Sequence, residues 1–193
     1  MAANDNRRTD AARPEIRLCA EQDGPEILRV INAAAVAYRD VISADRWHDP
    51  YMLIGELRAE MAAGVHFTGF YRDDGLIGVM GIQQVKNVRL IRHAYVLPQR
   101  QGQGIGARLI EYLRGAGNGQ ILVGTWAAAN WAIRFYERHG FELVSRAAIA
   151  PLLRTYWNVP ERQIETSVVL SIPALSARDA MQMITASTIF LNK

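Results

Sequence analysis

The sequence has little cysteine, little lysine and no long apolar run, and each scarcity excludes a class of protein. Cys19 is the only cysteine, so neither an internal disulfide nor a cysteine-rich zinc site can form, which fits a cytoplasmic protein. The longest apolar segment, 27–37, is interrupted by Arg29 and Asn32, well short of the roughly 18 residues that a membrane span requires. We therefore expect no membrane-crossing segment and no metal site.

Positive charge is thinly spread along the chain. Of its 22 basic residues only Lys86 and Lys193 are lysines, and the net charge is +3 at pH 7. The longest basic run, Arg7-Arg8, is too short to follow a phosphate backbone. Nucleic acid is therefore not expected as a partner.

Length and hydrophobicity indicate one folded domain with tails. The chain has 193 residues, half of them hydrophobic, which is enough for one core but not for two full-sized ones. Residues 1–14 contain three arginines and no apolar stretch, so we interpret them as a flexible leader and not as a secretory signal. The domain then covers residues 15–170, and residues 171–193 form a tail that we expect to be helical.

The periodicity of apolar residues predicts an alternation of strands and helices. The strands are expected at 15–19, 65–71, 76–85, 88–97, 120–125, 141–147 and 165–170. The helices are expected at 25–38, 52–61, 107–115 and 130–139. The Asp-Gly pair at 74–75 predicts an antiparallel hairpin. The expected fold class is therefore α/β or α+β, with one mixed sheet and flanking helices.

The most informative segment is the glycine-rich turn between the strand that ends at Leu97 and the helix that follows. It reads Gln101-Gly102-Gln103-Gly104-Ile105-Gly106-Ala107. Glycine allows a positive φ and lets backbone N–H groups approach an anion closely, and the N-terminus of the following helix favours negative charge. We interpret the turn as a phosphate cradle. A plain connection between strand and helix is the alternative.

Two common nucleotide loops are excluded by the spacing of this turn. The nucleoside-triphosphate loop requires Gly-Lys-Ser/Thr, and the segment has no lysine. The dinucleotide fingerprint requires glycines two and then three residues apart and an acidic residue about 20 positions later. Here the spacing is two and two, and the later region around Trp126 is apolar.

The turn resembles the pyrophosphate loop of the GNAT superfamily of acyl-CoA-dependent N-acetyltransferases, which reads Gln/Arg-x-x-Gly-x-Gly/Ala. A second element of that family, Asn-x-x-Ala-x-x-Phe-Tyr-x-x-x-Gly-Phe, is matched from Asn130 to Phe141. The resemblance covers residues 15–170 and is most specific over 95–141. It implies a GNAT-like mixed, mostly antiparallel central sheet flanked by helices. The sheet would be splayed between the strands ending at Leu97 and Thr125 to admit CoA.

The resemblance also implies a function. Acetyl-CoA would be the co-substrate, with no metal, and its acetyl group would pass directly to a primary amine of a small molecule or peptide. The residues that would bind acetyl-CoA are Val96, Leu97, Gln101, Gly102, Gln103, Gly104, Ile105, Gly106, Ala107, Asn130 and Tyr136. The alternatives are a non-catalytic acyl-CoA-binding or sensor module on the same fold, and a structural or interaction protein.

By the same resemblance, Tyr136 protonates the departing thiolate, and a backbone N–H of Val96 or Leu97 polarises the thioester carbonyl. Without the resemblance, Tyr136 would be interpreted as a buried aromatic beside Phe135. Asn130 would bind the pantetheine arm, cap the helix that it begins, or do both.

The general base is where the sequence departs from the family pattern. Many members have Glu where this chain has Arg92, and arginine cannot serve as a base at neutral pH. His93, expected on the opposite face of the strand, is the candidate base, since imidazole titrates near neutral pH. A water molecule held by Gln83 or Gln84, with His93 a structural residue, is the alternative.

The acceptor site is expected between the first two helices, their connecting loop and the late strands. The aromatic residues available there are Tyr38, Trp47, Tyr51, Trp126, Tyr156 and Trp157. The acidic residues are Asp40, Asp45, Asp49, Glu56 and Glu60, a combination that suits a cationic amine. The alternative is that these acids only form a solvated surface, and the acceptor itself is not identified. In the tail, an apolar stripe and the segment Ile189-Phe190-Leu191 predict either packing on the same domain or a homodimer contact.

Overall fold

The computed structural model describes residues 14–44, 47–73 and 75–189. Its strands are β1 (Glu15–Leu18), β2 (Val65–Arg72), β3 (Gly75–Val85), β4 (Val88–Val96), β5 (Ile121–Trp126), β6 (Glu142–Leu143) and β7 (Ser167–Ile172). Its α-helices are α1 (Gly24–Ala35), α2 (Ile54–Ala62), α3 (Ile105–Gly115), α4 (Asn130–Arg138), α5 (Arg146–Tyr156), α6 (Glu161–Glu165) and α7 (Ala177–Ile189). Short 3-10 turns lie at Glu21–Asp23, Val36–Tyr38 and Pro98–Arg100. Most of the leader, residues 1–13, lies outside the described part.

The described strands form one seven-stranded sheet in the order β1-β2-β3-β4-β5-β7-β6. Every neighbouring pair is antiparallel except β4 and β5, which run parallel. The pair is joined by a crossover that contains α3, as a parallel connection requires. This arrangement confirms the expected mixed, mostly antiparallel sheet flanked by helices.

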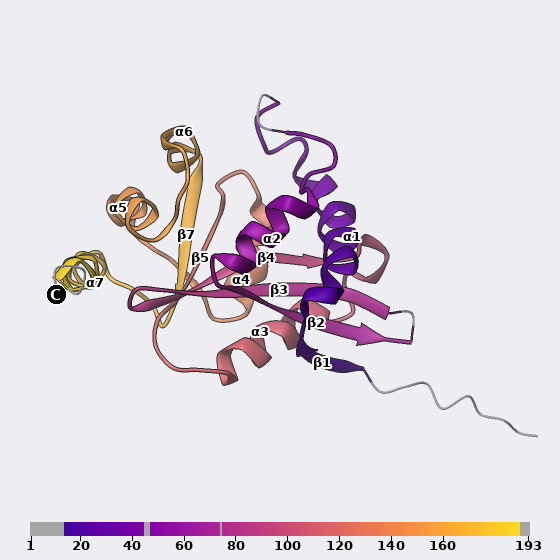
Figure 1. The fold of residues 1–193 in the computed structure, drawn as a ribbon. Coiled ribbons are helices and arrows are strands. Elements are labelled where there is room, and N and C mark those ends of the chain that lie inside the picture. Colours follow the sequence, from indigo (N-terminus) through magenta and orange to yellow (C-terminus); the bar gives the residue numbers. More distant parts are fainter. Residues whose placement is uncertain (1–13, 45–46, 74, 190–193) are drawn as a thin grey trace, which may run out of the picture.

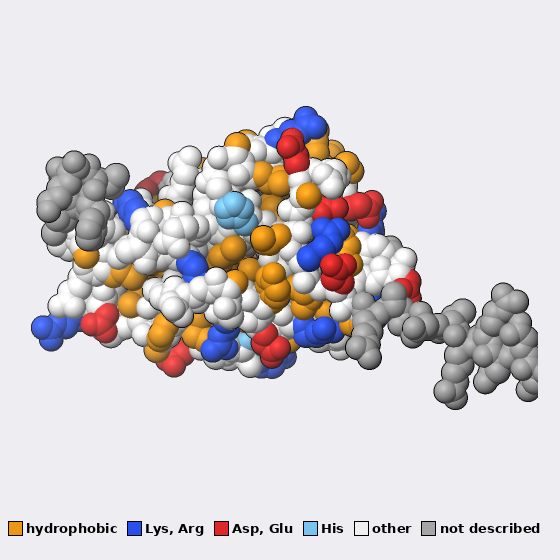
Figure 2. Space-filling model, turned by 60° about the horizontal axis from the view of Figure 1, so that its bottom comes forward, with side chains coloured by type: hydrophobic (Ala, Val, Ile, Leu, Met, Phe, Trp, Pro, Cys, Tyr) orange, Lys and Arg blue, Asp and Glu red, His pale blue; other side chains and the backbone are white. Residues whose placement is uncertain are grey.

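Helices cover both sides of the sheet (Figure 1). Helices α1 and α2 lie on one side of β2–β4, and α3 lies on the other. The apolar stripe of α1 buries Ile27, Val30 and Ile31 completely, as its helical spacing predicts. When the lower side of Figure 1 is brought forward, hydrophobic side chains gather in the middle of the face, with charged side chains mainly around its margin (Figure 2).

The region after α4 differs from the sequence prediction. The expected strand 141–147 is only the two-residue β6, and α5 and α6 follow it where no helix was predicted. Pro151, normally a helix breaker, lies inside α5. The helix persists because Leu152, Leu153 and Tyr156 are buried against the sheet, so tertiary packing outweighs the local preference.

The tail packs on its own domain. β7 extends to Ile172, so the sheet includes the first residues of the expected tail. Helix α7 begins only after Ser176, whose hydroxyl accepts the amide N–H of Asp179 at 3.1 Å. Ala180 of α7 is fully buried in a second apolar cluster with α5. Phe190 and Leu191, part of the expected dimer contact, lie outside the described residues.

Candidate active site

The glycine-rich turn joins the end of β4 to the start of α3 and exposes main chain there. Gly102 and Gly104 both have φ +75°, the left-handed region that glycine adopts without a steric penalty. Gly104 directly precedes α3. The Gln101 Nε2 donates to the Val96 carbonyl at 3.2 Å and ties the turn back to the strand. The first amide groups of α3 therefore face outward at the positive end of a helix.

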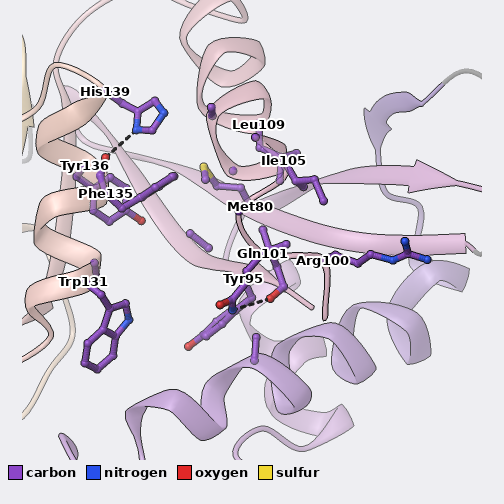
Figure 3. A pocket seen from close by; sticks show the side chains of 18 of the residues that line it. Met80, Tyr95, Arg100, Gln101, Ile105, Leu109, Trp131, Phe135, Tyr136 and His139 are labelled. Atoms are coloured by element: carbon purple, nitrogen blue, oxygen red, sulfur yellow. Dashed lines mark hydrogen bonds between the residues drawn. The ribbon is translucent and has the colours of Figure 1, made fainter. Parts of the chain in front are cut away.

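A cavity of about 610 Å³ lies beside this turn, between β4, α3 and α4. Figure 3 shows Trp131, Phe135 and Tyr136 entering it from α4, with Ile105 and Leu109 coming from α3. Of the residues expected to bind acetyl-CoA, those that line it are Val96, Gln101, Gly102, Gly104, Ile105, Gly106, Ala107 and Tyr136. Most of the predicted set is thus gathered around one cavity.

Three members of the predicted set do not line the cavity. The Leu97 side chain is buried, and its amide N–H donates to the Ile77 carbonyl of β3 at 3.0 Å. The Gln103 Oε1 accepts a hydrogen bond from Arg72 at 3.0 Å. Asn130 is exposed at the first residue of α4. The structure therefore places these three side chains outside the cavity.

The sheet opens next to the cavity. β4 and β5 pair only at three positions, the last being Ile91 with Val123, although β4 continues to Val96 and β5 to Trp126. Because backbone N–H groups alternate along a strand and that of Leu97 points to β3, the N–H of Val96 points into this opening. The expected splay between the two strands is confirmed.

A second cavity, of about 190 Å³, meets the first at the splay. Ala94, Tyr95, Tyr38 and Tyr136 line both cavities. Tyr136 is only 5% exposed, and burial, with a smaller contribution from Tyr38, raises the pKa of its hydroxyl. The phenol therefore stays protonated at the junction of the two cavities.

His93 lines the second cavity and occupies an unusual backbone position. Its φ is +51°, and the register shift between Val79 and Gly81 leaves two residues of β4, His93 and Ala94, opposite one residue of β3. Such a bulge interrupts the alternation of side chains. His93 therefore does not lie opposite Arg92 as the alternation predicted: both side chains reach Glu60 of α2.

The two glutamines expected to hold a water molecule are already engaged. The Gln83 amide donates to the Ala63 carbonyl and accepts from Arg92. The Gln84 amide donates to backbone carbonyls of the β3–β4 turn. Neither glutamine lines either cavity, which leaves His93 as the titratable base candidate of the predicted set.

The acceptor-site prediction is only partly met by the structure. Tyr38, Tyr51, Trp126 and Trp157 line the second cavity. Tyr156 instead donates its hydroxyl to Asn87 in the second apolar cluster, and Trp47 lies against Tyr51 without lining the cavity.

The predicted acids are not in the lining. Glu56 accepts the Leu53 amide of its own helix, Asp49 pairs with Arg39, and Glu60 pairs with β4. Asp40 does not line either cavity, and Asp45 lies outside the described residues. Within the described residues, these acids therefore do not form an acidic acceptor pocket.

Several residues of the site were not identified from the sequence. Met80, Trp131, Arg138 and His139 line the larger cavity, and Arg92 lines the smaller one. The Nδ1 of His139 contacts the Phe135 carbonyl at 2.7 Å. His139 is the C-cap residue of α4, three positions after Tyr136, and this spacing is the signal that places it on the same side of the helix.

The structure also bears on cofactor classes. Among the described residues, no group of three or more His, Cys, Asp or Glu side chains is placed to hold a metal ion. Within the same residues, no helix combines the length and apolar character needed to cross a membrane. The outward-facing turn, the positive helix end and the splayed strands instead fit an elongated thioester that carries a pyrophosphate.

The fold and this loop resemble those of acetyltransferase domains of the GNAT type. Residues 63–143 match the model of the acetyltransferase (GNAT) domain. The match includes both sequence elements that carried the resemblance, which is thereby confirmed.

Individual known proteins resemble the chain more distantly. A mycothiol acetyltransferase from Rhodococcus erythropolis (strain PR4 / NBRC 100887) is 29% identical over 138 residues, which are 63% of this chain and 44% of that protein. The chain thus spans less than half the length of this curated relative.

Solved structures share the fold. The ribosomal-protein-S18-alanine N-acetyltransferase of Escherichia coli has a TM-score of 0.60 at 16% identity, covering 83% of this chain and 94% of that one. The PaiA N-acetyltransferase of Thermoplasma acidophilum, in complex with coenzyme A, has a TM-score of 0.57 at 15% identity, covering 83% and 98%.

Proposed function

We propose that this protein transfers the acetyl group of acetyl-CoA directly to a primary amine. The observation that carries the proposal is the meeting of two cavities at Tyr136. One contains the glycine-rich turn suited to a pyrophosphate, and the other contains His93. A thioester in the first cavity and an amine in the second would face each other through the splay, which is the arrangement that direct transfer needs.

The glycine-rich turn would hold the pyrophosphate through backbone N–H groups, with Gly102, Gly104 and Gly106 keeping side chains away from it. Ile105 and Ala107 would take part through their amides at the start of α3. The pantetheine arm would follow the gap between β4 and β5. There the N–H of Val96, and not that of Leu97, is free to polarise the thioester carbonyl.

Two side chains would move protons. The amine nitrogen attacks the carbonyl carbon, a C–N bond forms and the C–S bond breaks. His93 accepts the proton that the attacking nitrogen loses, and the Tyr136 hydroxyl donates a proton to the departing sulfur. The raised pKa of Tyr136 keeps the proton available, although it makes the phenol a weaker acid, so close contact with the sulfur is essential.

The acceptor cavity favours an amine attached to an apolar or aromatic group. Its lining is rich in tyrosine and tryptophan, and among the described residues it includes a guanidinium, Arg92, but no carboxylate. A polycationic amine would find no opposite charge there, whereas flat apolar groups pack well against aromatic rings. A small-molecule amine or a peptide N-terminus with an apolar side chain fits both the size and the charge.

A panel of amines tests the proposal. Purified protein is incubated with acetyl-CoA and each amine, and release of the CoA thiol is followed together with the mass of the acetylated amine. We expect amine-dependent release, fastest for amines with an apolar substituent. Tight acetyl-CoA binding by calorimetry without release for any amine would instead establish the alternative, a sensor that binds acyl-CoA.

We further propose that the enzyme works in the cytoplasm as a homodimer. The single cysteine supports a reducing compartment. Met181 of α7 is 48% exposed, an apolar side chain on the outer side of this helix that a second copy could cover. Light scattering on Met181→Glu tests the contact: a shift from dimer to monomer is expected, and an unchanged mass would remove α7 from the interface.

A further inference from the structure

One carboxylate of α2 contacts two consecutive residues of β4. The Glu60 Oε2 lies 2.9 Å from Nη2 of Arg92 and 3.3 Å from Nε2 of His93. Consecutive residues of a regular strand point to opposite faces, so one side chain cannot normally reach both. The left-handed φ of His93 at the bulge turns its side chain toward the same side as that of Arg92.

The backbone of His93 is strained for a non-glycine residue. A positive φ is unfavourable for any residue other than glycine and persists only where the surrounding structure enforces it. Gly81, which pairs with Arg92, gives the backbone room for this bulge, because a Cβ there would lie only 2.9 Å from the Arg92 carbonyl oxygen. The bulge and the small residue opposite it together bring the imidazole to Glu60.

The three side chains are sheltered from water. The exposed fractions are 15% for His93, 23% for Arg92 and 27% for Glu60, and the Phe67 ring stacks on the imidazole at 5.9 Å. The Nε2 of His93 is buried and makes no hydrogen bond to any residue that the structure describes. A buried polar nitrogen without a partner is energetically costly. A small rotation of the imidazole ring would let the nearby Glu60 oxygen accept the Nε2–H.

Glu60 itself is poorly suited to accept the proton of the amine. Its contact with His93, and after it the charge of Arg92, hold the pKa of the carboxyl below its usual range. It therefore remains ionised as an acceptor of the imidazole N–H. It also does not line the acceptor cavity, whereas His93 does.

We infer that Glu60 is a positioning residue for His93, and this inference rests on the proposed function. Its carboxylate accepts the Nε2–H, which fixes the tautomer with the lone pair on Nδ1, and Nδ1 then takes the proton from the acceptor amine. The carboxylate also stabilises the imidazolium that forms. The guanidinium of Arg92, which donates to Gln83 at 2.8 Å, contacts the same carboxylate. Its positive charge disfavours the imidazolium.

The charged and titratable groups around the imidazole determine whether each substitution favours or disfavours the imidazolium. Glu60 faces it from α2 and Arg92 from its own strand. The tyrosines of the same cavity, Tyr38, Tyr51, Tyr95 and Tyr136, are neutral at pH 7. Removing the carboxylate therefore disfavours the imidazolium, and removing the guanidinium favours it.

The kinetic test compares Glu60→Gln, Arg92→Met and His93→Ala across pH. For Glu60→Gln we expect kcat/KM on its plateau to fall on the order of tenfold and the acidic limb to move to lower pH. For Arg92→Met the limb moves to higher pH. The double variant Glu60→Gln/His93→Ala should be no slower than His93→Ala alone, because Glu60 acts through His93.

A second readout does not need turnover. The pH at which the His93 ring protons change their chemical shift, followed by NMR in the free protein, should move to lower values in Glu60→Gln and to higher values in Arg92→Met. Opposite shifts cannot arise from general loosening of the fold. The matched control is Glu56→Gln, one turn earlier on α2. Its carboxylate accepts the Leu53 amide, away from His93, and the substitution should leave both readouts unchanged.

The outcomes separate this inference from the proposed function. A normal pH profile in Glu60→Gln, or shifts in the same direction in both single variants, would overturn the positioning role while leaving acetyl transfer intact. Failure of the unaltered protein to acetylate any amine would overturn the proposed function, and the role of His93 with it. Opposite NMR shifts in that case would still establish the electrostatic coupling of Glu60 to the imidazole.

Discussion

Gly106 lies directly against the ring of Phe135. A β-carbon on Gly106 would be 2.8 Å from Cζ of Phe135, closer than such atoms approach in real proteins. The contact brings the first turn of α3 and the middle of α4 together at the larger cavity. The third glycine of the turn is thus required by the packing of two helices, whereas Gly102 and Gly104 are required by their positive φ.

The first prediction concerns these glycines. Gly104→Val forces a β-branched residue into the left-handed region, which costs at least about 1–2 kcal/mol, and Gly106→Val pushes the Phe135 ring into the cavity. Both should abolish acetyl-CoA binding measured by calorimetry. Gln103→Ala should bind normally because its side chain contacts Arg72 outside the cavity.

Gly115→Ala is the matched control for the glycine variants. Apart from the neighbouring residues and the backbone of α3, no described atom lies within 4 Å of a β-carbon built there, so acetyl-CoA affinity should be unchanged. Circular dichroism establishes that each variant is folded. Normal affinity in folded Gly104→Val and Gly106→Val would remove the turn from the cofactor site.

The second prediction concerns the hydroxyl of Tyr136. Tyr136→Phe keeps the ring that packs on Phe135 and Phe141 and removes only the proton. Turnover should fall about ten- to a thousandfold with acetyl-CoA affinity unchanged, in line with general-acid contributions. Tyr112→Phe, on the exposed surface of α3, should retain full activity. Equal turnover in the two variants would return Tyr136 to a purely structural role.

The third prediction concerns pH and Asp23. Its carboxylate accepts the Ala20 amide at 2.8 Å, Arg17 at 3.0 Å and the Tyr71 hydroxyl at 3.0 Å. The hydrogen bond from Arg17, aided by the other two, lowers the pKa of the carboxyl. A lowered pKa contributes stability that is present above the unfolded value of about 4 and is lost as pH falls through the folded value.

Urea unfolding of Asp23→Asn checks this sign. The variant should be less stable than the parent at pH 7, and the difference should shrink as the pH falls below about 4. Glu21→Gln, an exposed neighbour, should show little difference at either pH. If the difference in free energy of unfolding between the parent and Asp23→Asn does not change with pH, the carboxylate charge contributes nothing to stability.

The fourth prediction concerns Arg89 of β4. Its guanidinium donates to the carbonyls of Leu113 and Gly117 at 3.0 and 2.7 Å, which satisfies the end of α3. Arg89→Met removes two charge-assisted hydrogen bonds and should lower the free energy of unfolding by about 2 kcal/mol. Arg58→Met, exposed on α2, should change it by less than about 0.5 kcal/mol. Equal stability of the two variants would contradict the capping role.

The parts of the fold that sequence reasoning found are those encoded locally. The hairpin between β2 and β3 follows from the Asp-Gly pair. The turn before α3 follows from its glycines, two of which have a positive φ. Helix α5 was missed because Pro151 argues against a helix locally, and only burial of Leu152 and Leu153 decides otherwise.

The site shows the same division between local and distant information. Tyr136 and the turn were found because each belongs to a compact motif. The pairing of Glu60 with His93 was not, because 33 residues separate them and the bulge that joins them depends on the fit of β3 against β4. An isolated strand pattern gives no sign of a bulge, so it placed His93 on the wrong face.

A single-turnover experiment tests the central claim of direct transfer most directly. Protein in excess over acetyl-CoA is mixed with the best amine of the panel, quenched at intervals, and both the amine and the intact protein are weighed by mass spectrometry. We predict that acetylated amine appears in one phase as acetyl-CoA disappears, with no acetylated protein at any time. Accumulation of acetylated protein before the product, or no amine-dependent loss of acetyl-CoA, would contradict it.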